Sequence, residues 1–439
     1  MGKGVLTQAG ERAGGAAGGL DALLSDAGLC RRGGSLFLGG VRLTDVADAA
    51  GTPTYVYNLD VVRARYRALD AALTPIPHRI CFALKANGNL AVLRALAALG
   101  AGADIVSGGE LRRALGAGFP AARVVFSGVG KSDAELEAAV VAQVGHIHIE
   151  STAELAALAT IAERHQRSLT LGIRVNPDVT ADTHPYIATG RGGIKFGVPF
   201  DQVVPLARQI AAHPLLTLDT VAMHIGSQIL DPGPYREGVE RLLELVAACR
   251  DAGISSISSL DIGGGLGIRY REETPLEPAV LLGAVLPVLR PTGLALALEP
   301  GRYLTGPAGV LLTEVLSRKH SGGKDLAIVD AGMNDLVRPS HYSAYHEIVE
   351  LEASGRPQSP VDVVGPVCET GDFLALDRTL PALERGDRLA VLGAGAYGFV
   401  MSSNYNGRPR AAEVAVDGPT WTIARPRETV DDLLRAEDR

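Results

Sequence analysis

The sequence lacks long apolar runs and an excess of basic residues. No segment reaches the 18 or more consecutive apolar residues that a membrane-spanning helix needs, and the first thirty residues lack a basic stretch followed by an apolar one. The 42 Lys and Arg residues stand against 49 Asp and Glu, which gives a net charge of −7 without any long basic run. We therefore expect a cytoplasmic protein that binds neither a membrane nor nucleic acid.

Cysteine is also scarce. Cys30, Cys81, Cys249 and Cys368 lie far apart, and the sequence contains neither a C-x-x-C pair nor a cluster of cysteine and histidine. This spacing argues against a structural zinc site and against a disulfide framework. We expect free thiols and no metal.

Glycine, in contrast, is abundant, with 53 of 439 residues. A hydrophobic content of 46% excludes a disordered or collagen-like chain, and the length suffices for two to three domains of about 150 residues each. Residues 1–30 are rich in Gly and Ala and show little periodicity. We expect this segment to be mobile at least in part.

Short apolar runs alternate with helical patterns from residue 59 onwards. Eight runs occur: ICFALKA (80–86), ADIV (103–106), RVVFSG (123–128), HIHIE (146–150), LTLGIRV (169–175), TVAMHIG (220–226), SISSLDIGG (256–264) and LALALEP (294–300). Eight strands separated by helices predict a closed (β/α)₈ barrel over residues 58–308. An open doubly wound sheet is the alternative, disfavoured because the count stops at eight and because polar residues follow nearly every strand.

Two of the helical patterns open with Ser-x-x-Glu, at Ser132 to Glu135 and at Ser151 to Glu154. This spacing predicts capping boxes, in which the serine and glutamate side chains bond each other's backbone N–H groups. The texture changes after the eighth strand, where short strand-like runs are separated by turns. We expect residues 309–439 to form a mainly β domain together with residues 31–57, with the barrel inserted between its two parts.

Polar residues at the predicted strand ends would face one mouth of the barrel. A lysine within a buried strand end, Lys85, loses solvation, and this loss lowers its pKa toward that of a nucleophilic amine; the alternative is an ion pair with a carboxylate such as Asp104. His224 could lie against a flat ring, or be an ordinary hydrogen-bonded barrel histidine. Glu299 could hold a ring nitrogen protonated, or bind Arg302 as a structural carboxylate.

The glycine run Gly263-Gly264-Gly265-Leu266-Gly267 follows the seventh strand, and Gly301 and Arg302 follow the eighth. Barrels commonly bind phosphate in these two loops, because glycine lets backbone N–H groups approach the anion. A lysine, a phosphate cradle, a carboxylate for a ring nitrogen and an imidazole for stacking together describe a site for pyridoxal 5'-phosphate.

From about residue 50 to about residue 417, the sequence contains long motifs that match those of a known enzyme family in the same order. They are FALKANGNLAVLRALAALGAGADIVSGGEL, THPYIATG, HIGSQI, DIGGGLGIRY, EPGRYL, VDAGMNDLVRP, GPVCETGD and GAYGFVMSSNYNGRPRAAEV. In these motifs the chain resembles the barrel-type (fold type III) pyridoxal-phosphate decarboxylases of basic amino acids.

The resemblance implies roles for individual residues. Lys85, Cys368, His224 and Glu299 would be catalytic, with Lys85 binding the cofactor covalently and Cys368 donating a proton to the substrate. The implied cofactor-binding set is Lys85, Asp104, His224, Ser227, Gly264, Gly265, Glu299, Gly301, Arg302 and Tyr397. The implied substrate-binding set is Arg302, Arg338, Tyr342, Glu369 and Tyr397. Cys368 and Glu369 would reach the active site of the neighbouring subunit in a homodimer.

The function implied by the resemblance is decarboxylation of meso-2,6-diaminopimelate to L-lysine and CO₂, the last step of lysine biosynthesis. Three alternatives remain. A paralogous decarboxylase would act on an ornithine-like, lysine-like or other related amino acid. A racemase on the same scaffold commonly has arginine near the ring nitrogen, where this chain has Glu299. A cofactor-binding protein without turnover would lack the second domain.

Overall fold

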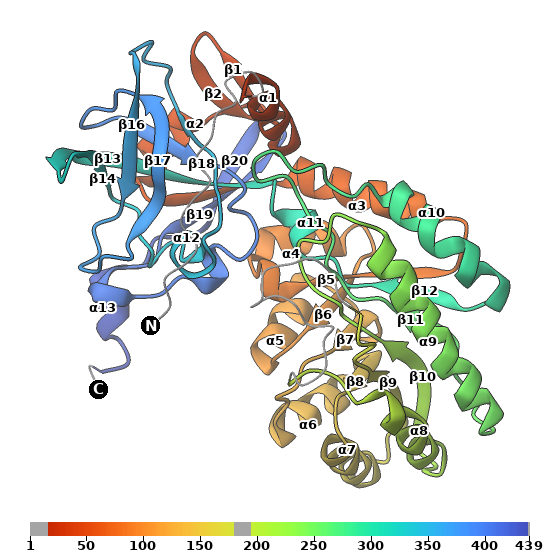
Figure 1. Ribbon diagram of the computed structural model, residues 1–439. Coiled ribbons are helices and arrows are strands. Elements are labelled where there is room, and N and C mark those ends of the chain that lie inside the picture. The colour runs from red at the N-terminus through yellow and green to blue at the C-terminus, as the bar shows by residue number, and fades with distance from the viewer. Residues whose placement is uncertain (1–15, 180–194, 438–439) are drawn as a thin grey trace.

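The computed structural model describes residues 16–179 and 195–437, and a closed barrel of eight parallel strands dominates the fold (Figure 1). The strands are β5 (His78–Ala83), β6 (Gly102–Ile105), β7 (Val124–Phe126), β8 (His146–Ile149), β9 (Leu169–Arg174), β10 (Leu216–Ala222), β11 (Ser259–Asp261) and β12 (Ala295–Leu298). Neighbours in sequence pair in space, and β12 closes onto β5 with Leu296 opposite His78. The predicted (β/α)₈ barrel is confirmed, and the open sheet is excluded.

Helices cover the outside of the strands in Figure 1. They are α3 (Leu59–Leu73), α4 (Leu90–Ala97), α5 (Gly108–Ala117), α6 (Asp133–Ala142), α7 (Thr152–His165), α8 (Val203–Ala211), α9 (Gly233–Asp251) and α10 (Pro278–Leu289), whereas the short, buried α11 (Arg302–Thr305) follows β12. Their apolar residues recur at helical spacing, as in α3, where Leu59, Val62, Tyr66, Leu69 and Leu73 are buried. The side chain of Asn58 accepts the backbone N–H groups of Asp60 and Val61 and so fixes the start of α3.

The two predicted capping boxes differ in the structure. At α6 the box is complete, because Ser132 and Glu135 each accept the other's backbone N–H. At α7 the Ser151 hydroxyl accepts the N–H of Glu154, but the Glu154 carboxylate turns away. It accepts the ammonium of Lys131 at 2.5 Å and the N–H of Glu150 at 2.9 Å. The second box is therefore wrong, since an ion pair with a buried lysine occupies the glutamate.

A mainly β unit accompanies the barrel, as predicted. Its nine-stranded sheet contains β4 (Thr54–Asn58), β13 (Gly309–Ser321), β14 (Lys324–Val329), β15 (Ile348–Glu350), β16 (Gln358–Val364), β17 (Phe373–Pro381), β18 (Arg388–Val391), β19 (Ala412–Asp417) and β20 (Thr420–Arg425). Strand β4 pairs antiparallel with β13 and parallel with β19. The barrel thus lies between two strands of one sheet, and we propose that the chain divides at residues 58 and 308.

Two short helices, α12 (Arg338–Tyr342) and α13 (Val430–Leu434), complete this unit. A separate three-stranded sheet of β1 (Leu29–Arg32), β2 (Ser35–Leu38) and β3 (Val41–Arg42) packs on it with α2 (Leu43–Ala50). Leu36 and Leu38 share a core cluster with Val310 and Leu312 of β13. Of the described helices, none combines the length and apolar character needed to cross a membrane.

The glycine-rich segment 1–30 is described only from residue 16. Residues Ala16–Ala27 form helix α1, and Leu23 and Ala27 lie in the core cluster shared with β13. In its described part the segment is therefore helical and packed, because its leucines face an apolar surface that the sequence pattern alone does not reveal.

Candidate active site

Lys85 lies directly after β5, in the one-turn 3₁₀ helix Leu84–Ala86, at the end of the barrel where the strands finish. Its Nζ donates to Oδ2 of Asp104 at 2.7 Å, and Asp104 on β6 is fully buried. Burial lowers the pKa of Lys85, but the carboxylates of Asp104 and Glu299 outweigh that effect and raise it above its ordinary value. The expected lowering of this pKa is therefore wrong, and the alternative of an ion pair with Asp104 is confirmed.

Three buried carboxylates gather at this end of the barrel: Asp104, Asp261 at the end of β11 and Glu299 after β12. Burial raises the pKa of Glu299 well above its usual range, and the charges of Asp104 and Asp261 add to this effect. The pKa of Asp261 is likewise raised, first by burial. Oδ1 of Asp104 and Oδ2 of Asp261 are buried without a hydrogen-bond partner among the described residues. Three carboxylates thus lie close to one another around the ammonium of Lys85.

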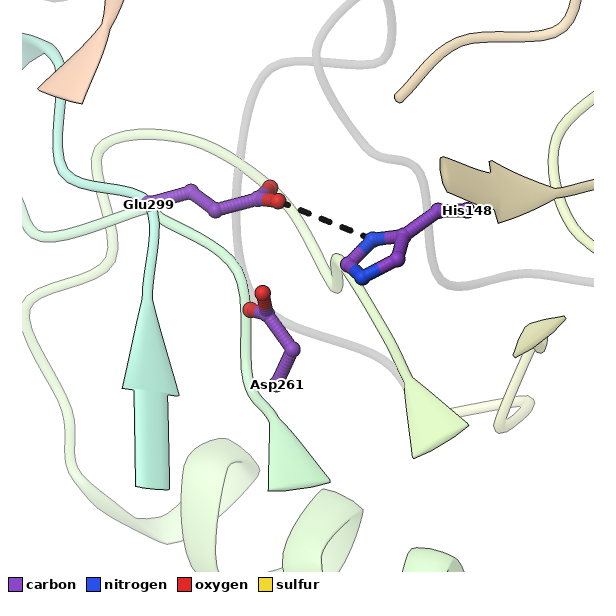
Figure 2. Close-up of side chains that lie close together, drawn as sticks. All are labelled: His148, Asp261 and Glu299. Carbon is purple, nitrogen blue, oxygen red and sulfur yellow. Dashed lines mark ion pairs between the residues drawn. The ribbon is translucent and has the colours of Figure 1, made fainter. Parts of the chain in front are cut away.

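Figure 2 shows His148 of β8 directed toward Glu299, with the Asp261 carboxylate below that of Glu299 on the same side of the imidazole. His148 Nδ1 stands 3.8 Å from Oε1 of Glu299. The hydroxyl of Ser127 lies between these groups, because it donates to Glu299 at 3.2 Å and is 3.4 Å from the same His148 nitrogen. Glu299 is not bound to Arg302, which excludes the structural carboxylate considered from the sequence, because Arg302 bonds elsewhere.

The glycine run after β11 packs too tightly for side chains. A Cβ on Gly264 would stand 2.3 Å from the carbonyl oxygen of Glu299, and Gly265 combines φ of +102° with a contact of 2.6 Å to the carbonyl of Gly226. The N–H of Gly264 donates to Nδ1 of His224 at 3.3 Å. Burial lowers the pKa of His224, so the imidazole is neutral. The bare backbone of this loop therefore lies beside His224, as a phosphate or ring site requires.

Two buried arginines share one phenol oxygen beside the glycine loop. Nη1 of Arg302 and Nη1 of Arg338 donate to Oη of Tyr270 at 2.6 and 2.8 Å. Burial alone would raise the pKa of Tyr270, but the two guanidinium groups reverse this and lower it. Nη2 of Arg302 donates to Ser227 at 3.0 Å, and Nη1 of Arg338 also donates to His346. The two positive charges are thus held side by side, ready for an anion.

Gly301 and Tyr397 connect this cationic side to Lys85. A Cβ on Gly301 would approach Ala86 to 2.8 Å and the Tyr397 hydroxyl to 3.4 Å. Tyr397 has φ of +56°, and its backbone N–H donates to the carbonyl of Ala86. The guanidinium of Arg302 stands 5.0 Å from the Tyr397 ring centroid. Both residues therefore lie where the barrel meets the β unit.

A cavity of about 370 Å³ brings these groups together. Its lining includes the predicted residues Lys85, His224, Ser227, Arg302, Arg338, Tyr342 and Tyr397, and also Phe196, Gln228, Tyr270, Glu273, Ala344 and Tyr345. Seven of the predicted residues, distant in sequence, thus face one cavity.

Cys368 and Glu369 do not reach this cavity. They are exposed on the loop between β16 and β17, where the N–H of Cys368 donates to Oδ1 of Asn406. Within one chain the structure therefore separates these two predicted site residues from the others. The motif THPYIATG falls at 183–190, outside the described residues.

Sequence reasoning missed Tyr270, His346, Asp261 and the pair Ser127 and His148. Tyr270 and Asp261 lie within the motif DIGGGLGIRY, so their position beside the glycine run was a usable signal. Ser127 and His148 end neighbouring strands at the same barrel mouth, which was also readable. His346 follows no strand of the barrel, and only the folded chain brings it to Arg338.

Comparisons with known proteins agree with this geometry. Residues 59–306 match the family described as "Pyridoxal-dependent decarboxylase, pyridoxal binding domain". The diaminopimelate decarboxylase of Pseudomonas fluorescens is 49% identical over 407 residues, which cover 92% of this chain and 97% of that protein. The diaminopimelate decarboxylase of Aquifex aeolicus is 47% identical and is covered to 96%.

Solved structures give the same result. The diaminopimelate decarboxylase of Helicobacter pylori, complexed with L-lysine, has a TM-score of 0.87 at 39% identity, over 90% of this chain and 99% of that one. The lysine/ornithine decarboxylase of Vibrio vulnificus, complexed with putrescine, has a TM-score of 0.76 at 22% identity, over 86% of this chain and 97% of that one, and so shares the fold.

Proposed function

Because the chain belongs to the family of pyridoxal-dependent decarboxylases, we propose that it releases CO₂ from meso-2,6-diaminopimelate and yields L-lysine, with pyridoxal 5'-phosphate as cofactor. The observation that carries this proposal is the 49% identity to a diaminopimelate decarboxylase over 97% of that protein. Ornithine or lysine decarboxylation is the second candidate, and it rests on fold alone.

The residues at the barrel mouth fit pyridoxal phosphate. Lys85 supplies an amine for the aldehyde, and the bare glycine backbone beside Arg302 and Ser227 offers donors for a phosphate. Asp104 and Asp261 each have one carboxylate oxygen without a hydrogen-bond partner among the described residues, and both raise the pKa of the nearby Glu299. These three carboxylates together favour a bound group that carries a positive charge. A protonated pyridine nitrogen is such a group.

When bound, the cofactor accepts the electron pair that remains on Cα after the carboxylate leaves as CO₂. The Glu299 carboxylate would keep the ring nitrogen of the cofactor protonated. The imidazole of His224, next to the glycine loop, would stack on the face of the cofactor ring. Asp104 accepts the ammonium of Lys85 at 2.7 Å and so orients the amine that binds the cofactor. The neutral imidazole of His224 adds no charge that would compete with Lys85.

We propose that the active protein is a homodimer in which Cys368 and Glu369 enter the site of the partner. Their exposure, and their absence from the cavity of their own chain, support this arrangement. Cys368 would then deliver the proton that Cα needs after CO₂ leaves. The free thiols of all four cysteines are consistent with the cytoplasmic location that forms part of the proposal.

Substrate choice would rest on charges at the far end of the substrate. Diaminopimelate ends there in a second amino acid group, so it needs a cation for the carboxylate and an anion for the ammonium. Arg338, buried in the cavity, and Glu369 of the partner's loop supply one of each. Lysine and ornithine lack the second carboxylate, and they would leave the Arg338 charge without an anion, which weakens their binding.

A substrate panel tests the proposal. Protein loaded with pyridoxal phosphate is incubated with meso-diaminopimelate, L-lysine or L-ornithine, and CO₂ and the amine product are measured. We expect CO₂ and L-lysine in equal amounts from meso-diaminopimelate, with little release from the other two. Faster release from lysine or ornithine would favour the second candidate, and inversion at Cα without CO₂ would identify a racemase.

A further inference from the structure

A short chain of polar side chains contacts the carboxylate of Glu299. It runs from His148 on β8 through Ser127 after β7 to Glu299 after β12. His148 is 1% exposed and Ser127 is 5% exposed, so no bulk water competes for these contacts. Figure 2 shows the imidazole edge directed at the Glu299 carboxylate. None of the roles assigned above uses His148 or Ser127.

The direction of the hydrogen bonds depends on the charge of Glu299. A serine hydroxyl has one hydrogen, and Ser127 places it toward Oε1 of Glu299 at 3.2 Å. The hydroxyl oxygen can then only accept from His148, whose Nδ1 is 3.4 Å away, so Nδ1 must carry the proton. A protonated Glu299 would permit the reverse order, with Ser127 donating to a bare Nδ1 and the imidazole proton moved to Nε2.

The surroundings of His148 favour the arrangement in which Nδ1 of His148 carries the proton and Ser127 donates to Glu299. Its Nε2 is buried and has no hydrogen-bond partner among residues 16–179 and 195–437. A proton on Nε2 would therefore be a buried donor without an acceptor, whereas a proton on Nδ1 is used by Ser127. Burial and nearby cations lower the pKa of His148, so one ring nitrogen stays unprotonated. The charged and titratable groups near the chain are Arg79, Lys85, Asp104, His146, Lys131, Arg174, Asp261 and Glu299.

We propose that His148 is a positioning residue that acts through Ser127 to keep the Glu299 carboxylate ionised and directed at the ring nitrogen of pyridoxal phosphate. The proposal rests on the proposed function for the identity of the bound group. Burial, Asp104 and Asp261 all favour a proton on Glu299, and a protonated Glu299 cannot hold a proton on the ring. The Ser127 hydroxyl, oriented by the Nδ1–H of His148, opposes this tendency, because a hydrogen bond donated to the ionised carboxylate stabilises its charge.

The central experiment reads the ring nitrogen directly, without substrate. The protein is loaded with pyridoxal phosphate labelled with ¹⁵N in the ring, and the ¹⁵N chemical shift reports whether this nitrogen is protonated. His148→Leu and Ser127→Ala each interrupt the chain. We expect both variants to move the shift toward that of a neutral pyridine, and to lower kcat roughly tenfold or more while KM changes little.

Two further variants separate this role from a structural one. His148→Asn places an amide nitrogen where Nδ1 stands, so it should restore most of the wild-type shift. His165→Leu is the matched control, because it makes the same change away from the barrel mouth. His165 ends α7, and its Nε2 bonds Oε1 of Glu137 at 2.7 Å. This control variant should leave the ring-nitrogen shift unchanged. The double variant of Ser127 and His148 should match the single variants, since both residues belong to one chain.

An unchanged ring-nitrogen shift in His148→Leu would overturn the inference, as would an equal shift in His165→Leu. A metal ion found in the holoenzyme on His148, Asp261 and Glu299, whose ligand atoms lie within 4.8 Å of one another, would also overturn it. The proposed function is judged separately. If diaminopimelate gives no CO₂ but His148 still controls the shift, the proposed function fails and this inference stands.

Discussion

At the scale of single residues, the barrel mouth places three buried carboxylates close to one lysine, Lys85. Lys85 pairs with Asp104 at 2.7 Å, while Asp261 and Glu299 carry raised pKa values because burial and mutual repulsion disfavour their charged forms. A cationic ring bound among them would relieve this repulsion. The strength of cofactor binding should therefore depend on these side chains as much as on the phosphate contacts.

Loss of Lys85 should abolish covalent attachment of the cofactor. Borohydride reduction fixes pyridoxal phosphate on the lysine that binds its aldehyde, and peptide mass mapping then locates it. We expect the wild type to carry the label on Lys85 and Lys85→Ala to carry none. Lys131→Ala is the matched control, because Lys131 also follows a barrel strand but pairs with Glu154. A label elsewhere in the wild type would refute the assignment of Lys85.

Asp335 should make the protein less stable as the pH rises. Burial raises the pKa of Asp335 to about 7, whereas an aspartate in an unfolded chain has a pKa of about 4. The folded state therefore binds the proton more tightly. This contribution to stability is complete below about pH 4 and is lost as the pH rises through about 7.

Asp335→Asn stays neutral at every pH and should lack this dependence. Relative to the wild type, its free energy of unfolding should improve between pH 4 and pH 8 by about 2–4 kcal/mol. Denaturant titrations at several pH values measure this difference. Asp325→Asn, at a half-exposed position on β14, is the control and should leave the slope as in the wild type. Equal slopes for all three proteins would contradict the assignment of Asp335.

The chemistry of single residues was only partly readable from the sequence. The position of Lys85 and Asp104 at adjacent strand ends followed from the order of the strands. The sign of the Lys85 pKa shift did not, because it depends on distances to Asp104 and Glu299 that only the closed barrel sets. The predicted roles of the site residues remain predictions.

At the scale of elements, the loop after β11 tests how closely the backbone must approach the cofactor. Gly264→Ala would place a methyl group 2.3 Å from the carbonyl of Glu299, so the loop or the end of β12 must move. We expect a weaker affinity for pyridoxal phosphate, by tenfold or more, and a loss of stability on the order of 1–3 kcal/mol. Cofactor titration and thermal unfolding measure these two effects.

Gly283→Ala is the matched control. Gly283 lies inside α10, and no atom stands within 4 Å of its added Cβ. The same substitution there should raise stability by up to about 1 kcal/mol, because alanine is the better helix former, and should leave cofactor affinity unchanged. An equal loss of affinity in both variants would remove the role of the loop.

Strands with strong apolar patterns were predictable and others were not. All eight barrel strands appeared as short apolar runs, because parallel strands buried on both faces exclude polar side chains. Strands β15 and β17 were not among the strand-like runs recognised after residue 309, which were LLTEVLS, DLAIVDA, VDVVGPV, DRLAVLG, AAEVAVDG and TWTIA. In β17, Leu376 and Asp377 face solvent and the pattern is broken by polar residues, so its pairing with β16 rather than its own sequence makes it a strand.

At the scale of the whole molecule, the proposed homodimer predicts that two defective chains can repair each other. Lys85→Ala and Cys368→Ala should each be nearly inactive alone. A hybrid dimer would contain one intact site, formed by Lys85 of one chain and Cys368 of the other. Refolding the two variants together in equal amounts should therefore restore about a quarter of the wild-type activity. If mixing restores nothing although hybrid dimers form, each chain supplies both residues to one site.

The insertion of the barrel between β4 and β13 also sets an order for synthesis. Tyr57 of β4 pairs with Gly309 of β13, and Thr54 pairs with Ala412 of β19. Both partners leave the ribosome only after the complete barrel has been made. Until then β4 exposes two unpaired edges, which nascent chains can join wrongly. Early barrel closure would hold β4 near the place where its partners emerge.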